Sequence, residues 1–359
     1  MIRPGGKTHL TMLFALGLGV AAFVDAGRLH AASFAEAIAL YQEGQYAEAW
    51  KVAHELALAG NAEAQAMLGV LLENGQGVKK DVQQAAQWYR KAAEQGHVGA
   101  MYALALLHLN GKLGRKDIGA ALRWARAAAE KGHSGAAYTM GLILSGMEGL
   151  KPDWKAAAEW FRKAAEAGNP AAQYNLGVLY LLGRGVERDS ITAAEWFKRA
   201  ALAGLPRAAM KYGVLVFNGE GVVKNERIGA QWLAAAARSG NAQAMLHLAR
   251  LLAVGRGVRK DRIEAAKWYI LARKRGLKDT FLDLFLRKMK RPDLAEARRR
   301  AAAFRPTRMR GFSMVDPRGK GSRLKTGKHT PAKKTNGRSD QKNPKRTAPK
   351  TKAKGQAGN

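Results

Sequence analysis

The chain of 359 residues is 47% hydrophobic, which is enough to bury a sizeable core, and it contains no cysteine. The absence of cysteine excludes disulfides, thiolate nucleophiles and thiolate metal sites. Lysine and arginine number 61 against 28 aspartates and glutamates, which gives a formal net charge of +33. This excess predicts that anionic molecules are among the binding partners.

The N-terminal segment has the order of a secretory signal peptide. Two basic residues precede an apolar run over residues 10–24, and small residues follow at Ala26 and Ala31. The run is short for a membrane span, for which about 20 apolar residues are needed. We therefore expect residues 1–31 to be a signal peptide, cleaved after Ala31 or after Ala26, and no transmembrane segment in the mature chain. A retained anchor or a buried helix is the alternative.

Residues 33–60 follow this segment and predict a capping helical hairpin. Ser33 and Glu36 have the spacing of a capping box, which starts a helix by satisfying its first backbone N–H groups. The stretch "YQEGQYAEAW" has the pattern of two short helices joined by a glycine-containing turn. We expect this hairpin to cover the first repeat of the array that follows.

A strict period of 36 residues dominates the middle of the chain. Six of the eight tryptophans recur at this spacing: Trp88, Trp124, Trp160, Trp196, Trp232 and Trp268. The period divides residues 61–276 into six blocks of equal length without an insertion. Such periodicity is typical of solenoids, in which each unit buries its apolar face only against its neighbours.

Each block predicts two helices separated by turns. Small residues early in the block allow two helices to approach closely, and glycine-rich turns such as "NGQGV" end the first helix. The second helix then begins at an Asp or Asn with N-cap character: Asp81, Asp117, Asp153, Asp189, Asn225 and Asp261. Ala85, Trp88 and Ala92 fall on one face of the second helix, so we expect the tryptophan to pack inward between layers. A ladder of exposed indoles is the alternative.

The repeat resembles the Sel1-like repeat, a branch of the tetratricopeptide repeat superfamily. The pattern A-x-x-x-L-G-x-L-Y-x-x-G-x-G-V-x-x-D-x-x-x-A-x-x-W-[FY]-x-x-A-A-x-x-G is most complete in "AAQYNLGVLYLLGRGVERDSITAAEWFKRAALAG" over residues 171–204. The departures are local: Leu113 and Gly114 replace a Gly-Val pair, "SGMEGL" alters the third turn, and Arg273 replaces the second alanine of the sixth block. The resemblance implies an all-α fold, a right-handed α-solenoid of helix-turn-helix repeats.

Two further segments complete the predicted organisation. Residues 277–304 contain "FLDLFLRKM" and "DLAEARRRAAAF" around a proline, which predicts two capping helices at the C-terminal end of the array. Residues 305–359 carry 17 Lys or Arg against two Asp and few large apolar side chains. We expect a disordered, basic tail that contacts anionic envelope polymer or lipid headgroups. A tail without a binding role is the alternative.

Catalytic and metal-binding patterns are hard to find in this sequence. His97 and His133 begin successive blocks without an acidic or second histidine partner at ligand spacing. The overlapping matches to S-x-x-K and K-T-G in "SRLKTG" lie in the lysine-rich tail and cannot fill both roles of a folded site. We therefore expect no enzymatic activity, no catalytic residues, no cofactor and no metal.

The remaining candidate site is the surface formed by the first helices, which the resemblance to tetratricopeptide domains places along a concave groove. Equivalent positions of the repeats would line it with aromatic residues in the middle and basic residues toward the C-terminal end. The candidate partner-binding residues are Tyr102, Tyr138, Tyr174, Asn175, Arg207, Lys211, His247 and Arg250. This surface suits a protein or peptide partner with an acidic terminus. Packing of the tyrosines between repeats is the alternative.

These features together predict an exported bacterial protein–protein interaction scaffold or adaptor, periplasmic or secreted, from a Gram-negative organism. The resemblance implies adaptor roles in envelope assembly and signalling. Two other classes remain open at this point: a cell-wall or β-lactam hydrolase of the envelope, and a nucleic-acid-binding repeat protein whose N-terminal segment is not a signal. Nucleic acid fits the charge but not the signal peptide, so we expect no specific nucleic-acid partner.

Overall fold

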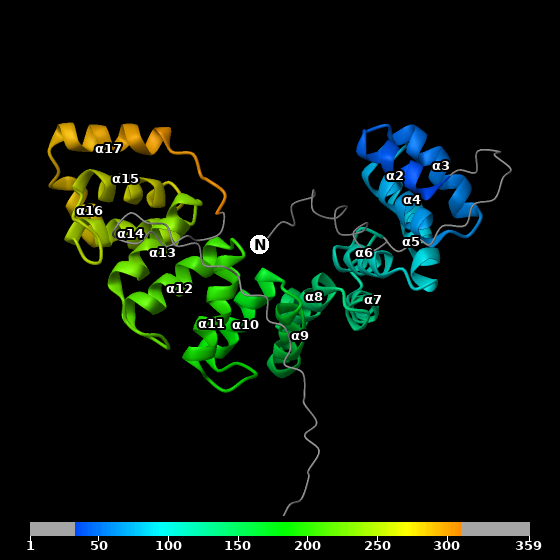
Figure 1. Ribbon diagram of the computed structural model, residues 1–359, viewed down its shortest axis with the longest axis horizontal. Helices are drawn as coiled ribbons and strands as arrows, with labels where there is room; N and C mark the ends of the chain where they lie inside the picture. Colours follow the sequence, from blue (N-terminus) through cyan, green and yellow to red (C-terminus); the bar gives the residue numbers. More distant parts are fainter. Residues whose placement is uncertain (1–32, 310–359) are drawn as a thin grey trace, which may run out of the picture. The chain divides into compact units, whose positions relative to one another are not determined.

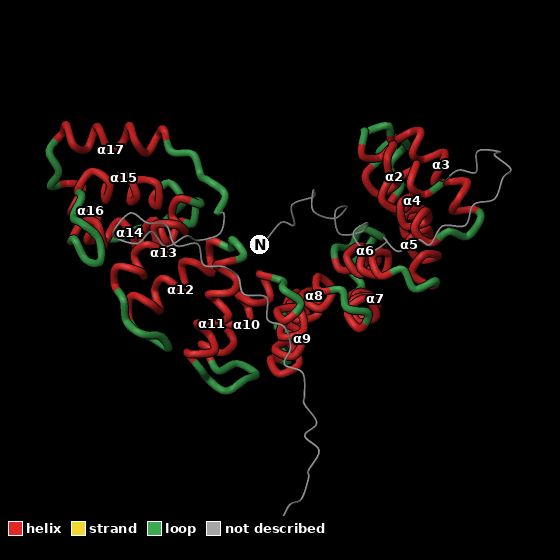
Figure 2. The backbone as a smooth tube through the Cα atoms, viewed as in Figure 1, coloured by secondary structure: helices red, strands yellow, loops and turns green. Residues whose placement is uncertain are grey.

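The structure is a computed structural model that describes residues 33–309, and this part of the chain is all α-helical (Figure 1). It contains 16 α-helices, one short 3-10 helix and no strand over those residues (Figure 2). The predicted fold class, an α-solenoid of helix-turn-helix repeats, is confirmed. The predicted signal peptide and the tail beyond residue 309 lie outside the described residues.

Helices pair into successive hairpins along the chain (Figure 1). The first hairpin is α2 (Phe34–Gln42) with α3 (Tyr46–Leu58). The first helices of the six repeats are α4 (Ala62–Asn74), α6 (Val98–Leu109), α8 (Ser134–Leu144), α10 (Pro170–Leu182), α12 (Pro206–Asn218) and α14 (Ala242–Val254). The second helices are α5 (Val82–Glu94), α7 (Ile118–Glu130), α9 (Trp154–Glu166), α11 (Ser190–Leu202), α13 (Glu226–Arg238) and α15 (Arg262–Arg273). The 3-10 helix η1 (Met147–Gly149) occupies the altered third turn, and α16 (Thr280–Arg287) and α17 (Arg291–Ala303) follow the last repeat.

The predicted helix boundaries arise from side-chain caps. Asp81 accepts a hydrogen bond from the backbone N–H of Gln84 at 2.9 Å, and the equivalent residue caps each of the other second helices. Several first helices end at a left-handed glycine such as Gly75, with φ at 71°, which an L side chain would adopt only with strain. Ser33 accepts from the Glu36 N–H and begins α2, as the sequence predicts.

In four of the six repeats the two helices meet at a glycine of the first helix, and in the other two at an alanine. A methyl group added to Gly69 would lie 2.5 Å from the ring of Tyr89, and one added to Gly141 would lie 2.6 Å from the ring of Phe161. Both rings are almost fully buried. In the second repeat an alanine replaces both partners, because Ala105 and Ala125 are each fully buried at the equivalent positions. In the sixth repeat the equivalent residues are Ala249 and Tyr269, both fully buried, so the size of the two partners varies between repeats.

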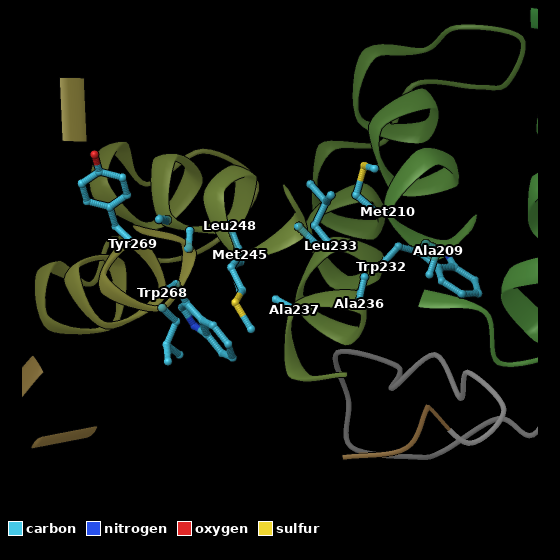
Figure 3. Close-up of a cluster of buried hydrophobic side chains, with 14 of the residues drawn as sticks. Ala209, Met210, Trp232, Leu233, Ala236, Ala237, Met245, Leu248, Trp268 and Tyr269 are labelled. Atoms are coloured by element: carbon cyan, nitrogen blue, oxygen red, sulfur yellow. The ribbon is translucent and has the colours of Figure 1, made fainter. Parts of the chain in front are cut away.

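All six tryptophans pack against the buried clusters, as predicted, but four of them are only partly buried. The half-buried tryptophans are Trp88, Trp124, Trp160 and Trp196. The residue that follows the tryptophan, such as Tyr89 or Phe161, points at the first helix instead. Basic side chains cover the indole faces; Lys91, for example, lies 4.3 Å from the centroid of Trp88. Only Trp232 and Trp268 are buried, in the core of the C-terminal repeats (Figure 3).

The C-terminal helices close the last repeat in the predicted place. Helix α17 packs on α15, and α16 contacts α14 and α15. Leu282 of α16 is fully buried and joins the core of the last two repeats. Ala297 and Ala301 of α17 are buried against the same end of the array. These two helices therefore cover apolar surface that a seventh repeat would otherwise need to cover.

Residues 304–309, which we call the strap, run from the end of α17 back along the preceding repeats. The ring of Phe304 lies edge-on to Trp268 with 5.3 Å between centroids. The Thr307 N–H donates to the carbonyl of Arg238 at 3.0 Å. The Met309 carbonyl oxygen lies 2.8 Å from where a methyl group on Gly204 would be. Residues 305–309 are predicted to belong to the disordered tail, but Thr307 and Met309 lie against the turns at the ends of α13 and α11.

The contact between Gly141 and Phe161 generates a stability prediction. We expect Gly141→Ala to lower the free energy of unfolding by about 1–3 kcal/mol, because the added methyl group would overlap the Phe161 ring. The loss should be smaller in a Phe161→Ala background, where the methyl group has room. A double-mutant cycle by urea denaturation measures this coupling.

Gly119→Ala is the matched control for this prediction. Gly119 is also in a helix, but its nearest neighbours would lie 3.4 Å or more from an added methyl group. This substitution should stabilise the protein by about 0.4–1 kcal/mol through the unfolded chain. Equal effects of the two substitutions would contradict the close-contact explanation.

Candidate functional site

The tyrosines predicted for the groove are half-buried and pack against aromatic rings of their own or the next repeat. Tyr102 of α6 lies 4.4 Å from the His133 ring, measured between centroids, and its hydroxyl is 3.4 Å from the Thr139 hydroxyl. Tyr138 of α8 lies 5.9 Å from the ring of Phe161. Burial raises the pKa of Tyr102 above its usual value. These tyrosines therefore contribute to packing as well as to the exposed surface.

Tyr174 packs against one aromatic ring, and an arginine stacks on it. Its ring lies 5.5 Å from Phe197, and the guanidinium of Arg207 lies 4.5 Å from its centroid. Burial raises the pKa of Tyr174, and the charge of Arg207 partly opposes that shift. The buried Nε of Arg207 has no hydrogen-bond partner among the described residues. Asn175, the neighbour of Tyr174, is half-buried.

Three basic residues at the C-terminal end of the surface form what we call the cationic cluster: Lys211, His247 and Arg250. Lys211 lies on α12, and the other two lie on α14 at a spacing of three residues, which places them on one face. Desolvation lowers the pKa of His247, and the charges of Arg250 and Lys211 lower it further. The structure thus brings these three predicted residues together, whereas the tyrosines lie in other repeats. His247 and Arg250 are exposed, and Lys211 is half-buried.

Arg250 already has an anionic partner within the fold. Its Nε donates to a carboxylate oxygen of Asp279, whose side chain is 1% exposed whereas that of Arg250 is 57% exposed. Asp279 is also the N-cap of α16 and accepts the N–H of Leu282 at 3.0 Å. Sequence reasoning missed this acid, although its position just before the apolar "TFLDLFLR" is an N-cap signal. Arg250 therefore joins the last repeat to the C-terminal helices.

The two histidines that begin repeats act as helix caps. The Nδ1 atoms of His97 and His133 each accept a backbone N–H at 3.0 Å, from Ala100 and Ala136. The Nε2 of His97 also lies 2.9 Å from a carboxylate oxygen of Glu63. Over residues 33–309, no group of three or more histidine, aspartate or glutamate side chains could hold a metal ion. Within the same range, no helix is both long and apolar enough to cross a bilayer.

Comparisons with known proteins place this fold among bacterial repeat proteins. No curated protein matches the chain. A protective antigen of uropathogenic Escherichia coli strains that displays an SLR fold is similar over 70% of this chain, with 31% identity and a TM-score of 0.63, and this chain covers 56% of that protein. A Sel1 repeat protein from Oxalobacter formigenes is similar over 70% of this chain and 100% of its own length, with 29% identity and a TM-score of 0.60.

The Sel1 repeat model matches six consecutive segments that follow the 36-residue period. They are residues 62–97, 98–133, 134–169, 170–205, 206–241 and 242–277. The segments begin one residue after the blocks read from the sequence and cover all of the repeat helices α4–α15. The Sel1 repeat fold is typically a non-catalytic binding scaffold. Because these matches span more than half of its length, the chain belongs to the Sel1 repeat family.

Proposed function

We propose that this protein is a non-catalytic scaffold that holds an acidic segment of a partner protein on the surface of its first helices. Sel1 repeat proteins generally mediate protein–protein interactions. The observation that carries the proposal is the cationic cluster of Lys211, His247 and Arg250, which gathers three basic side chains from two repeats on one face. Carboxylates of an acidic peptide are the natural partners of such a group.

The geometry of the surface favours a peptide that extends over several repeats. Lys211 and His247 occupy equivalent positions of neighbouring repeats, so an extended or helical segment can reach both. The half-buried rings of Tyr138 and Tyr174 lie on the preceding first helices and offer contacts to apolar side chains of the same segment. Arg207, above Tyr174, adds a cation between these two regions. The orientation that we propose places the acidic terminus at the cationic cluster.

The lowered pKa of His247 gives this proposal a pH signature. In the free protein the imidazole titrates below its usual pKa of about 6.5, but a bound carboxylate would favour its protonated form and raise the pKa. Binding therefore takes up a proton, and affinity should rise as the pH falls from about 8 to about 5.5, by up to roughly tenfold per unit of pKa shift. Fluorescence anisotropy of a labelled peptide ending in glutamates measures this dependence.

Two variants test whether the cationic cluster binds the acidic peptide. Lys211→Ala should weaken peptide binding at every pH, whereas His247→Gln should remove the pH dependence and leave binding at high pH almost unchanged. Lys79→Ala, in an exposed turn of the first repeat, is the charge-matched control. Binding that is insensitive to Lys211 and His247 but disappears at high salt would show that the acidic peptide binds elsewhere.

The ion pair of Arg250 with Asp279 predicts an effect on stability as well as on binding. We expect Arg250→Ala to lower the free energy of unfolding by about 1–2 kcal/mol, because the buried Asp279 carboxylate would lose a charged hydrogen-bond donor. Lys211→Ala should change stability by no more than about 0.5 kcal/mol. Urea denaturation of both variants measures the difference. If the Arg250 and Lys211 variants were equally stable, the ion pair with Asp279 would not stabilise the fold, and Arg250 would serve binding alone.

The proposal also includes export of the scaffold, to the periplasm or the exterior, and contact of the basic tail with anionic envelope polymer or lipid headgroups. Its support is the signal-like order of residues 1–31 and the charge of residues 310–359. Mass spectrometry of the protein recovered from a bacterial host should find an N-terminus at Ala32 or Gly27. An intact Met1 on protein that stays in the cytosol would contradict export.

A further inference from the structure

Helix α16 exposes two large apolar side chains. Phe281 is 46% exposed and Leu284 is 49% exposed, and their spacing of three residues places them on one face of the helix. Lys288, four residues after Leu284, is exposed and extends this face, and the exposed Lys278 precedes the helix. Among residues 33–309, Phe281 is the only exposed phenylalanine, tyrosine or tryptophan. The opposite face holds Leu282 in the core, so α16 cannot turn these side chains inward.

The surroundings of this apolar pair are strongly basic. Residues 273–309 contain 13 lysines and arginines against four acidic residues. Three of these acids are engaged within the fold. Asp279 pairs with Arg250, Asp283 accepts the Tyr269 hydroxyl at 2.7 Å, and Glu296 pairs with two arginines of α17. These two arginines lower the pKa of Glu296 to about 2, so it stays ionised at neutral pH. Most of the positive charge therefore faces solvent.

A cleft of about 480 Å³ lies between α15, α16 and α17, and its α16 residues lie on a different face of the helix from Phe281 and Leu284. Its apolar lining is Ile270, Leu286 and Leu294, and its charged lining is Arg273, Lys274, Arg287, Arg298 and Asp283. Arg273 stands where the other five repeats have alanine. The one departure from the repeat pattern in this helix thus adds a cation to the cleft, 3.5 Å from the Asp283 carboxylate.

We propose that the C-terminal cap, helices α16 and α17 with the end of α15, is a peripheral membrane-binding site for anionic phospholipid. Phe281 and Leu284 enter the boundary between headgroups and acyl chains, and the exposed basic residues of the cap, those of the cleft included, pair with headgroup phosphates. Apolar side chains flanked by lysines suit this boundary, because lysine stems lie along apolar surface while their charges reach the headgroups. Anionic lipid supplies the counter-charge for the basic residues around them.

A bilayer fits this surface better than an acidic protein does. A protein partner would have to bury Phe281 and Leu284 in a complementary pocket while also pairing with a broad field of arginines. A fluid anionic bilayer offers both chemistries over any area and requires no matching shape. The site shares no residue with the cationic cluster, so it goes beyond the proposed partner binding and does not depend on it.

Co-sedimentation of the full chain with vesicles tests the proposal. We expect binding to phosphatidylcholine vesicles that contain phosphatidylglycerol, and much weaker binding to phosphatidylcholine alone. The double variant Phe281→Ser/Leu284→Ser should lower the partition coefficient on the anionic vesicles by about tenfold. Both positions are exposed, so the fold should persist, which circular dichroism checks. Leu182→Ser/Ile191→Ser is the control, because these side chains are 52% and 63% exposed elsewhere in the array.

A second pair of variants tests the cleft. Lys274→Ala/Arg298→Ala should weaken binding to the anionic vesicles several-fold more than Lys79→Ala/Lys80→Ala, which removes the same charge from an exposed turn. The basic tail is intact in every variant. Unchanged binding by the Phe281/Leu284 variant would show that this apolar pair does not enter the bilayer and would overturn the proposal. The proposal would also be overturned if the protein did not bind vesicles. The same holds if it bound soluble polyglutamate and only the cleft variant weakened that binding.

Discussion

The contact between a small residue of each first helix, glycine or alanine, and the side chain that follows the repeat tryptophan sets how closely the two helices of a hairpin approach. At Gly69 and Gly141 the opposing ring leaves no room for even a methyl group. The second repeat has Ala105 with Ala125 at the opposing position, and the sixth has Ala249 with Tyr269, all of them fully buried. Helix spacing in the array therefore depends on a pair of positions rather than on one residue type.

This contact leaves other faces of the helices free to carry function. Because the inward positions are occupied by small and bulky partners in fixed register, equivalent outward positions of successive first helices fall in line. Lys211 and His247 are such equivalents, one repeat apart, and a peptide that lies along the array meets both. The repeat thus converts a sequence spacing of 36 residues into neighbouring side chains on one surface. The distinctive chemistry comes from residues that depart from the repeat pattern. Lys211 and His247 are examples on the first helices, and Arg273 is an example on α15.

Much of the fold could be predicted from the sequence because its signals are local and recur in phase. Asp81 and its equivalents, followed by the second helix, define helix starts without tertiary information. The inward aromatic residue could not be assigned, because Trp88 and Tyr89 both lie within one helical turn of the buried Ala85 and Ala92. The partner of Arg250 was also beyond prediction, since it lies 29 residues away in a helix outside the repeat pattern.

The strap has a consequence for how the array unfolds. In an ordinary solenoid each repeat interacts only with its neighbours, so terminal units can fray one at a time. Here Phe304 lies on Trp268 of the sixth repeat, Thr307 bonds to the end of the fifth, and Met309 reaches Gly204 at the end of the fourth. Detaching the last repeat also removes contacts two units away. The three C-terminal repeats are thereby coupled into one cooperative block, whose opening would be rarer than nearest-neighbour contacts alone allow.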